Sequence, residues 1–175
     1  MTDWTKAMNP TSLIKTEAEA TAAARASAIA IFLGVAWGLV GIIYIMTAGQ
    51  AVMEAAMAQA SAETPEMAGM AGPLTQFALW LSVGLVVIQL VIGLVQWAKP
   101  NIVIPIIFVI LVAFGLVSGI FGLVMAGSPN MPETAATPMW QVVIGLIILV
   151  IQMVLHIAGI RGAAKLDKLR FEAAR

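Results

Sequence analysis

Four long apolar segments without a charged side chain constrain the fold of this chain most strongly. They cover residues 29–47, 74–98, 102–126 and 139–160, and none of them contains Asp, Glu, Lys or Arg. About 20 mostly apolar residues suffice for an α-helix to cross a bilayer. Because 61% of all residues are hydrophobic, a soluble domain of this length could not keep them out of water. The sequence therefore predicts an all-α integral membrane protein with four transmembrane helices.

The charged residues around these segments predict the topology. The nine basic residues precede the first segment, lie between the second and third, or follow the fourth. The other two loops carry only the acidic residues Glu54, Glu63, Glu66 and Glu133. Since cytoplasmic loops are enriched in Lys and Arg, we expect both termini in the cytoplasm. Abundant alanine and the lack of cysteine favour a bacterial cytoplasmic (inner) membrane.

Two short phrases occur twice in the same order, which indicates a duplicated hairpin. "VAWGLV" at residues 35–40 returns as "VAFGLV" at 112–117, an offset of 77 residues. "VIQLV" at 87–91 returns as "VIQMV" at 150–154, an offset of 63 residues. Repeats inserted in the same orientation are related by a pseudo-two-fold axis along the membrane normal. We therefore predict two tandem, parallel-oriented helical hairpins that form a four-helix bundle.

These features divide the chain into four parts. Residues 1–28 form a cytoplasmic N-terminal segment with a short helix, which we expect Thr11 or Ser12 to cap. The first hairpin spans 29–98 and includes an outer helix or loop at about 48–73; the second spans 99–160, with an outer loop at about 127–138. Residues 161–175 form a basic, mildly amphipathic cytoplasmic tail, which we expect to contact anionic lipid headgroups.

Glycines recur at helical spacing in the first and third segments. Lipid provides no hydrophobic drive for helix association, so transmembrane helices approach one another closely where their residues are small. Residues at i, i+4 and i+7 share one face of a helix. The predicted helix-packing seam consists of Gly34, Gly38, Gly41, Gly115, Gly119 and Gly122.

Uncharged polar side chains form stripes along the second and fourth segments. An amide without a partner is costly in lipid, so these side chains must face protein or water. The predicted polar seam consists of Ser82, Gln89, Gln96, Gln141, Gln152 and His156. It has two interpretations, namely hydrogen bonding between helices and a hydrated path for a small neutral solute or an ion. We favour hydrogen bonding, because the segments contain no acidic residue, lysine or arginine.

Two further residue types suggest metal chemistry. The only histidine, His156, lacks a second ligand for a metal or haem, and we expect it to pack in the interior with a hydrogen bond to Gln152. Thioethers select Cu(I), but methionine also serves as an adaptable packing residue, which is the interpretation we favour. We expect no cofactor and no metal site; the candidate Cu(I) ligands are Met53, Met57, Met67 and Met70.

The chain contains no recognisable catalytic motif, so we expect a non-enzymatic protein. The main hypothesis is a small membrane subunit or scaffold that packs against itself or against a larger membrane complex. The alternative is a homo-oligomeric channel or uncoupled carrier that uses the Gln and Ser stripes, and external Cu(I) handling is a weaker alternative. We expect no nucleic-acid binding, because the basic stretches lie beside the membrane and are balanced by acidic residues.

Overall fold

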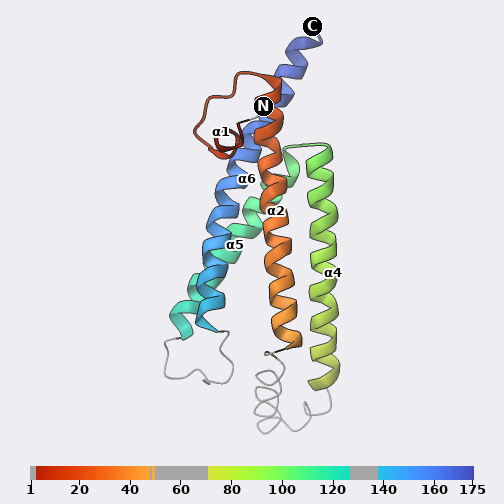
Figure 1. Ribbon diagram of the computed structural model, residues 1–175, viewed down its shortest axis with the longest axis vertical. Helices are drawn as coiled ribbons and strands as arrows, with labels where there is room; N and C mark the ends of the chain where they lie inside the picture. The colour runs from red at the N-terminus through yellow and green to blue at the C-terminus, as the bar shows by residue number, and fades with distance from the viewer. Residues whose placement is uncertain (1–2, 48, 50–70, 127–137) are drawn as a thin grey trace.

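The computed structural model describes residues 3–47, 49, 71–126 and 138–175 (Figure 1). Within these ranges the regular structure is entirely helical: α1 (Trp4–Met8), α2 (Glu17–Met46), α4 (Ala71–Ala98), α5 (Val103–Ala126) and α6 (Met139–Ala173). The last four helices are each long and apolar enough to cross a membrane. The prediction of an all-α chain with four bilayer-length helices is confirmed.

Helices α2 and α6 form the centre of the bundle. They run antiparallel beside each other, α4 packs against α2, and α5 packs against α6. The two outer helices α4 and α5 scarcely touch each other. Both termini and the turn between α4 and α5 lie at the same end of the bundle (Figure 1). That end therefore carries every basic residue of the chain.

The packing departs from the predicted pseudo-two-fold symmetry. Such an axis would bring α4 against α5 as closely as α6 lies against α2, whereas of these two pairs only α2 and α6 pack closely. Gly159 of α6 lies directly against Ser27 of α2. By the repeat offsets of 63 and 77, their counterparts are Gln96 and Ile104, which are too large for the same approach.

Helix α2 begins at a capping box rather than at the expected Thr11 or Ser12. The Thr16 hydroxyl accepts a hydrogen bond from the Glu19 backbone N–H (3.2 Å), and the Glu19 carboxylate accepts one from the Thr16 N–H (3.2 Å). A capping box needs Glu or Gln three residues after the capping residue. Only Thr16 meets this condition, because Ile14 and Lys15 stand at that spacing from the two expected caps.

The central helices extend beyond the apolar segments at the end that carries the termini. Helix α2 starts twelve residues before the predicted segment begins at Ile29, and α6 continues through the basic tail to Ala173. In the extension of α6, Gly162, Ala163 and Leu166 are buried, while Lys168 and Arg170 are exposed. The tail is thus a helix packed on one side, with basic and acidic residues on the other, where Lys168 pairs with Glu172 and Arg170 with Glu17.

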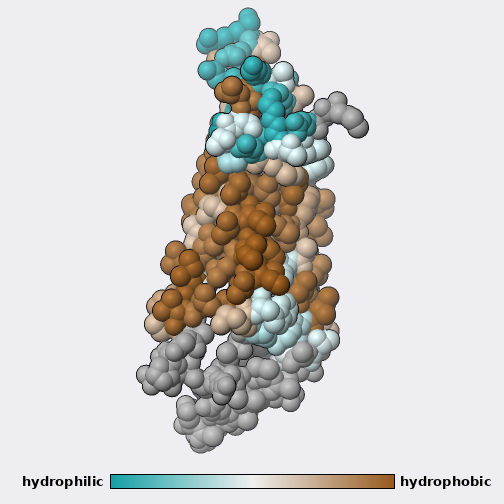
Figure 2. All heavy atoms as spheres, turned by 60° about the vertical axis from the view of Figure 1, so that its left-hand side comes forward, coloured by the Kyte–Doolittle hydropathy of each residue, from teal (hydrophilic) through white to brown (hydrophobic). Residues whose placement is uncertain are grey.

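The surface shows the division expected for a protein that spans a bilayer. On the face seen in Figure 2, apolar residues form a continuous band over the middle of the bundle, and hydrophilic residues gather at the end that carries the termini. Helices α4 and α5 contribute most of the large apolar side chains that are exposed. These side chains suit contact with acyl chains or with another membrane protein.

Candidate functional site

A cavity of about 320 Å³ lies among the four long helices, in the apolar part of the bundle. This volume falls at the lower end of the range for small-molecule sites in proteins. No charged residue of the described ranges lines it, and three of its side chains can form hydrogen bonds. The lining residues are Ile31, Gly34, Trp37 and Gly38 of α2, Leu85, Val86 and Gln89 of α4, Phe108, Leu111 and Val112 of α5, and Gly145, Ile148, Leu149 and Gln152 of α6.

Glycines on α2 and α6 allow bulkier side chains into this region. A Cβ atom on Gly34 would lie 2.5 Å from Gln152 Nε2 and 3.6 Å from Gln89 Oε1, so both amides reach the same glycine. Gly145 leaves room for the indole of Trp37, whose Nε1 atom would be 3.4 Å from a Cβ at that position. The two glutamines are the central residues of the repeated phrase, and the fold brings them together at α2.

The two amides differ in their hydrogen bonds. Gln152 Nε2 donates to the backbone carbonyl of Ala30 (2.9 Å) and thereby joins α6 to α2. Gln89 forms no hydrogen bond with any residue that the structure describes, and the same holds for the indole N–H of Trp37. The cavity therefore contains one amide engaged in helix packing and two polar groups free to meet a ligand.

The remaining members of the predicted polar seam do not join this cavity. Ser82 donates to the Ala78 carbonyl of its own helix (2.8 Å). Gln96 is fully buried at the other end of α4, where it bonds to the backbone of α2 and of the α4–α5 turn. Gln141 lies near Gly41, and its Oε1 atom is buried without a partner among the described residues. The predicted seam is thus divided among separate places in the bundle, and only Gln89 and Gln152 line the cavity.

His156 lies in the interior beside the cavity, as the packing hypothesis predicts, but with a different partner. Its Nδ1 atom is 2.8 Å from the hydroxyl oxygen of Ser27, and its ring stacks on Phe108 with centroids 5.3 Å apart. The expected bond to Gln152 is not formed, because that amide bonds to Ala30. The Nε2 atom of His156 is buried and has no hydrogen-bond partner in the described ranges.

The predicted glycine seam covers only part of the close contacts between helices. Gly38 packs on Val86, while Gly115 and Gly119 pack on Leu149 and Leu146; a Cβ on Gly122 would meet none of the described neighbours within 4 Å. Three glycines that the seam did not include also make close contacts: Gly93 at Phe32, Gly159 at Ser27 and Gly162 at Ala23 and Ala24; that of Gly162 is the closest of all. The close contacts of Gly159 and Gly162 could have been predicted from the small residues in two sequence stretches, the alanine run at 22–24 and "GIRGAA" at 159–164.

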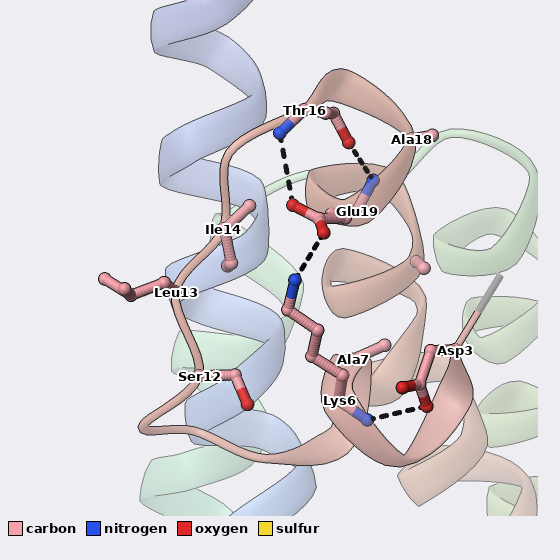
Figure 3. Close-up of a pocket in the computed structure, with 10 residues that line it drawn as sticks. Asp3, Lys6, Ala7, Ser12, Leu13, Ile14, Thr16, Ala18 and Glu19 are labelled. Carbon is pink, nitrogen blue, oxygen red and sulfur yellow. Dashed lines mark hydrogen bonds and ion pairs between the residues drawn. The ribbon is translucent and has the colours of Figure 1, made fainter.

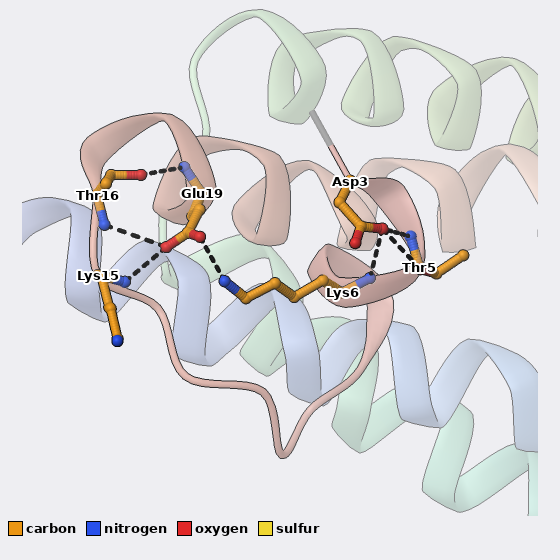
Figure 4. Close-up of polar contacts among 6 residues, drawn as sticks. All are labelled: Asp3, Thr5, Lys6, Lys15, Thr16 and Glu19. Carbon is orange, nitrogen blue, oxygen red and sulfur yellow. Dashed lines mark hydrogen bonds and ion pairs between the residues drawn. The ribbon is translucent and has the colours of Figure 1, made fainter. Parts of the chain in front are cut away.

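A second cavity, of about 500 Å³, lies at the end of the bundle that carries the termini (Figure 3). It is enclosed by α1, the following loop and the start of α2. Lys6 reaches across it to form an ion pair with Glu19. The carboxylate of Glu19 also accepts hydrogen bonds from the backbone N–H groups of Lys15 and Thr16 (Figure 4).

These contacts keep Glu19, which precedes the apolar part of α2, ionised. The hydrogen bond from Lys6, followed by those from the two backbone N–H groups, lowers the pKa of Glu19 to about 2. Since the cation and the carboxylate in this cavity bind each other, neither is free for a ligand. The cavity is best explained as a fold-back of the N-terminal segment onto α2.

Aromatic and basic contacts hold that segment in place. Trp4 of α1 stacks on Trp97 of α4, with centroids 5.9 Å apart. The guanidinium of Arg25 lies over the same indole at 5.2 Å and donates to the Trp97 carbonyl (3.0 Å). Arg161 of α6 donates to the Ser12 carbonyl (3.3 Å). The N-terminal segment thereby contacts α2, α4 and α6.

The structure does not test the candidate Cu(I) ligands. Met53, Met57, Met67 and Met70 lie outside the described residues. Within the described ranges, no group of three or more His, Asp or Glu side chains could hold a metal ion.

Comparison with protein-family models, with curated proteins and with solved structures found no match to this chain.

Proposed function

We propose that this protein is a non-enzymatic membrane subunit or scaffold that packs against itself or against a larger membrane complex. The observation that carries the proposal is the one-sided packing of α4 and α5, each of which contacts mainly a single neighbour. The rest of each helix presents large apolar side chains outward over its full length. Such surfaces suit association with further transmembrane helices.

The polar groups of the spans support a packing role. The amides of Gln96 and Gln152 donate to backbone carbonyls of α2, at Ala24 and Ala30. A hydrated path would need these groups free to face water along its length.

In this proposal the chain resides in a bacterial cytoplasmic membrane with both termini in the cytoplasm, the side favoured by its basic residues. Its two hairpins arose as copies of one unit.

A channel or uncoupled carrier is the second candidate, and one observation favours it. Gln89 has no hydrogen-bond partner among the described residues and faces a cavity in the middle of the bundle. A free amide in an uncharged cavity could pass a small neutral solute.

Replacing Gln89 and Gln152 together by leucine separates these two functions. A scaffold should keep its assembly, with only a modest change in stability, because interhelical hydrogen bonds in membranes contribute about 0.6–2 kcal/mol each. Vesicles reconstituted with the original protein and with the double variant should show the same water and glycerol permeability, as measured by stopped-flow light scattering. Native electrophoresis should show that both proteins form the same complex.

Gln76→Leu, an exposed amide at the other end of α4, is the matched control. Protein-dependent permeability that disappears in the double variant and persists in Gln76→Leu would contradict the scaffold proposal and establish a conducting cavity.

A further inference from the structure

We infer that the cavity among α2, α4, α5 and α6 binds a neutral amphiphile from the membrane, namely a molecule with an alkyl chain and a hydroxyl or carbonyl head. This inference does not depend on the proposed function, because a scaffold and a carrier could each hold such a molecule. It follows from three properties of the cavity: its free hydrogen-bonding groups, its lack of charge, and its position between two helices that do not close it.

The hydrogen-bonding groups match an oxygen-bearing head. The amide of Gln89 offers an acceptor and two donors, and Trp37 offers an indole donor; neither group is bonded to any described residue. Gln152 uses its Nε2 atom on Ala30, which leaves its carbonyl oxygen as a second acceptor. Polar groups in the hydrocarbon region need partners. A hydroxyl can donate to one amide oxygen and accept from Gln89 or Trp37.

The remaining lining selects a neutral and largely apolar molecule. The cavity wall consists otherwise of glycine, aliphatic side chains and Phe108, and none of the described residues that line it is charged. A charged head would be buried there without a counter-ion, which is strongly unfavourable. An alkyl chain would instead be in contact with the leucines and isoleucines of α4, α5 and α6.

The position of the cavity gives access from the lipid. Helices α4 and α5 pack on different neighbours and scarcely contact each other. Leu85 of α4 and Leu111 of α5 both line the cavity, yet they are 51% and 58% exposed. They therefore mark an opening toward the membrane between these two helices, through which an alkyl chain can enter.

The test uses a photoreactive decanol that carries a diazirine in its chain and an alkyne at its end. The full-length protein in phosphatidylcholine vesicles is irradiated with this probe, and labelled peptides are identified by mass spectrometry. Unlabelled decanol should prevent labelling around Leu85–Gln89 and Phe108–Val112, whereas decane, which lacks the hydroxyl, should prevent it poorly. Labelling elsewhere on the lipid-facing surface should not respond to decanol.

Two variants examine the polar and the apolar part of the site. Gln89→Leu should raise the decanol concentration needed for protection about tenfold, as expected for the loss of one good hydrogen bond. Leu85→Trp keeps the amide but fills the opening, so it should abolish the protectable labelling. Gln76→Leu, on the exposed surface of α4, should behave like the natural sequence.

The inference is overturned if decane protects as well as decanol, since the site would then be an ordinary lipid-facing groove. It is equally overturned if no labelling within the two cavity segments is protectable, or if Gln89→Leu leaves the protective concentration of decanol unchanged. Leu85→Trp gives an independent result should Gln89→Leu fail to fold, because protectable labelling that persists in Leu85→Trp also contradicts the site.

Discussion

Gly162→Ala should separate α2 from α6 and lower the free energy of unfolding by about 3 kcal/mol, at the upper end of the usual cost of overpacking. A Cβ atom at this position would lie 2.2 Å from the backbone nitrogen of Ala24 and 2.5 Å from the backbone carbon of Ala23. No flexible side chain can move aside, because the neighbouring atoms belong to the helix backbone. The two helices must shift, and the central contact of the bundle must weaken.

Two other glycines provide matched controls for this prediction. A Cβ on Gly84 of α4 or on Gly122 of α5 would meet no atom of another described residue within 4 Å. Alanine is the better helix former, so Gly84→Ala and Gly122→Ala should be neutral or slightly stabilising. Equilibrium unfolding in mixed micelles would measure the free energy of unfolding of all three variants. If the Gly162→Ala protein proves as stable as the Gly122→Ala protein, α2 and α6 do not pack as closely at Gly162 as the structure shows.

Gln96→Leu should lower the free energy of unfolding by about 2 kcal/mol, because three hydrogen bonds are lost from a buried site and each contributes about 0.5–1.5 kcal/mol. Gln96 is fully buried; its Nε2 atom donates to the carbonyls of Ala24 (3.4 Å) and Asn101 (3.1 Å). Its Oε1 atom accepts from the Asn101 N–H (3.3 Å). Asn101 in turn accepts a hydrogen bond from Ile104 at the start of α5 (3.0 Å).

The loss of Gln96 should therefore loosen the turn between α4 and α5 as well as the contact with α2. Faster hydrogen exchange at residues 99–104 would report the first effect, and unfolding in mixed micelles the second. The comparison is Gln76→Leu, which replaces an exposed amide on the same helix and should leave both measurements nearly unchanged. Equal effects of the two substitutions would refute the role assigned to Gln96.

The number and approximate position of the spans could be predicted because they depend on local composition. A charge-free apolar segment of sufficient length has few alternatives to a transmembrane helix. The ends of α2 and α6 could not be predicted in the same way. Arg25 and Arg161 end the apolar segments but not the helices, since α2 starts at the Thr16 capping box and α6 runs on to Ala173.

The sequence predicted which residues form the site and which helix faces they share, but not which residues they contact on other helices. Spacing indicated that Gln89 and Gln152 face protein or water, and the structure places both at Gly34. Spacing could not indicate which helix a glycine meets, because that depends on how the helices rotate and cross. For this reason Gly122 was included in the seam although it meets no neighbour, and Gly162, which makes the closest backbone contact, was not.

Thiol labelling from the two sides of the membrane tests the central claim, that four helices cross the bilayer with both termini and the α4–α5 turn on one side. The chain has no cysteine, so single substitutions of exposed residues give unambiguous sites. A membrane-impermeant maleimide should label Leu13→Cys, Lys99→Cys and Ala174→Cys in inside-out vesicles only, and Gly72→Cys in right-side-out vesicles only. Labelling of Leu13→Cys and Lys99→Cys from opposite sides would contradict the account.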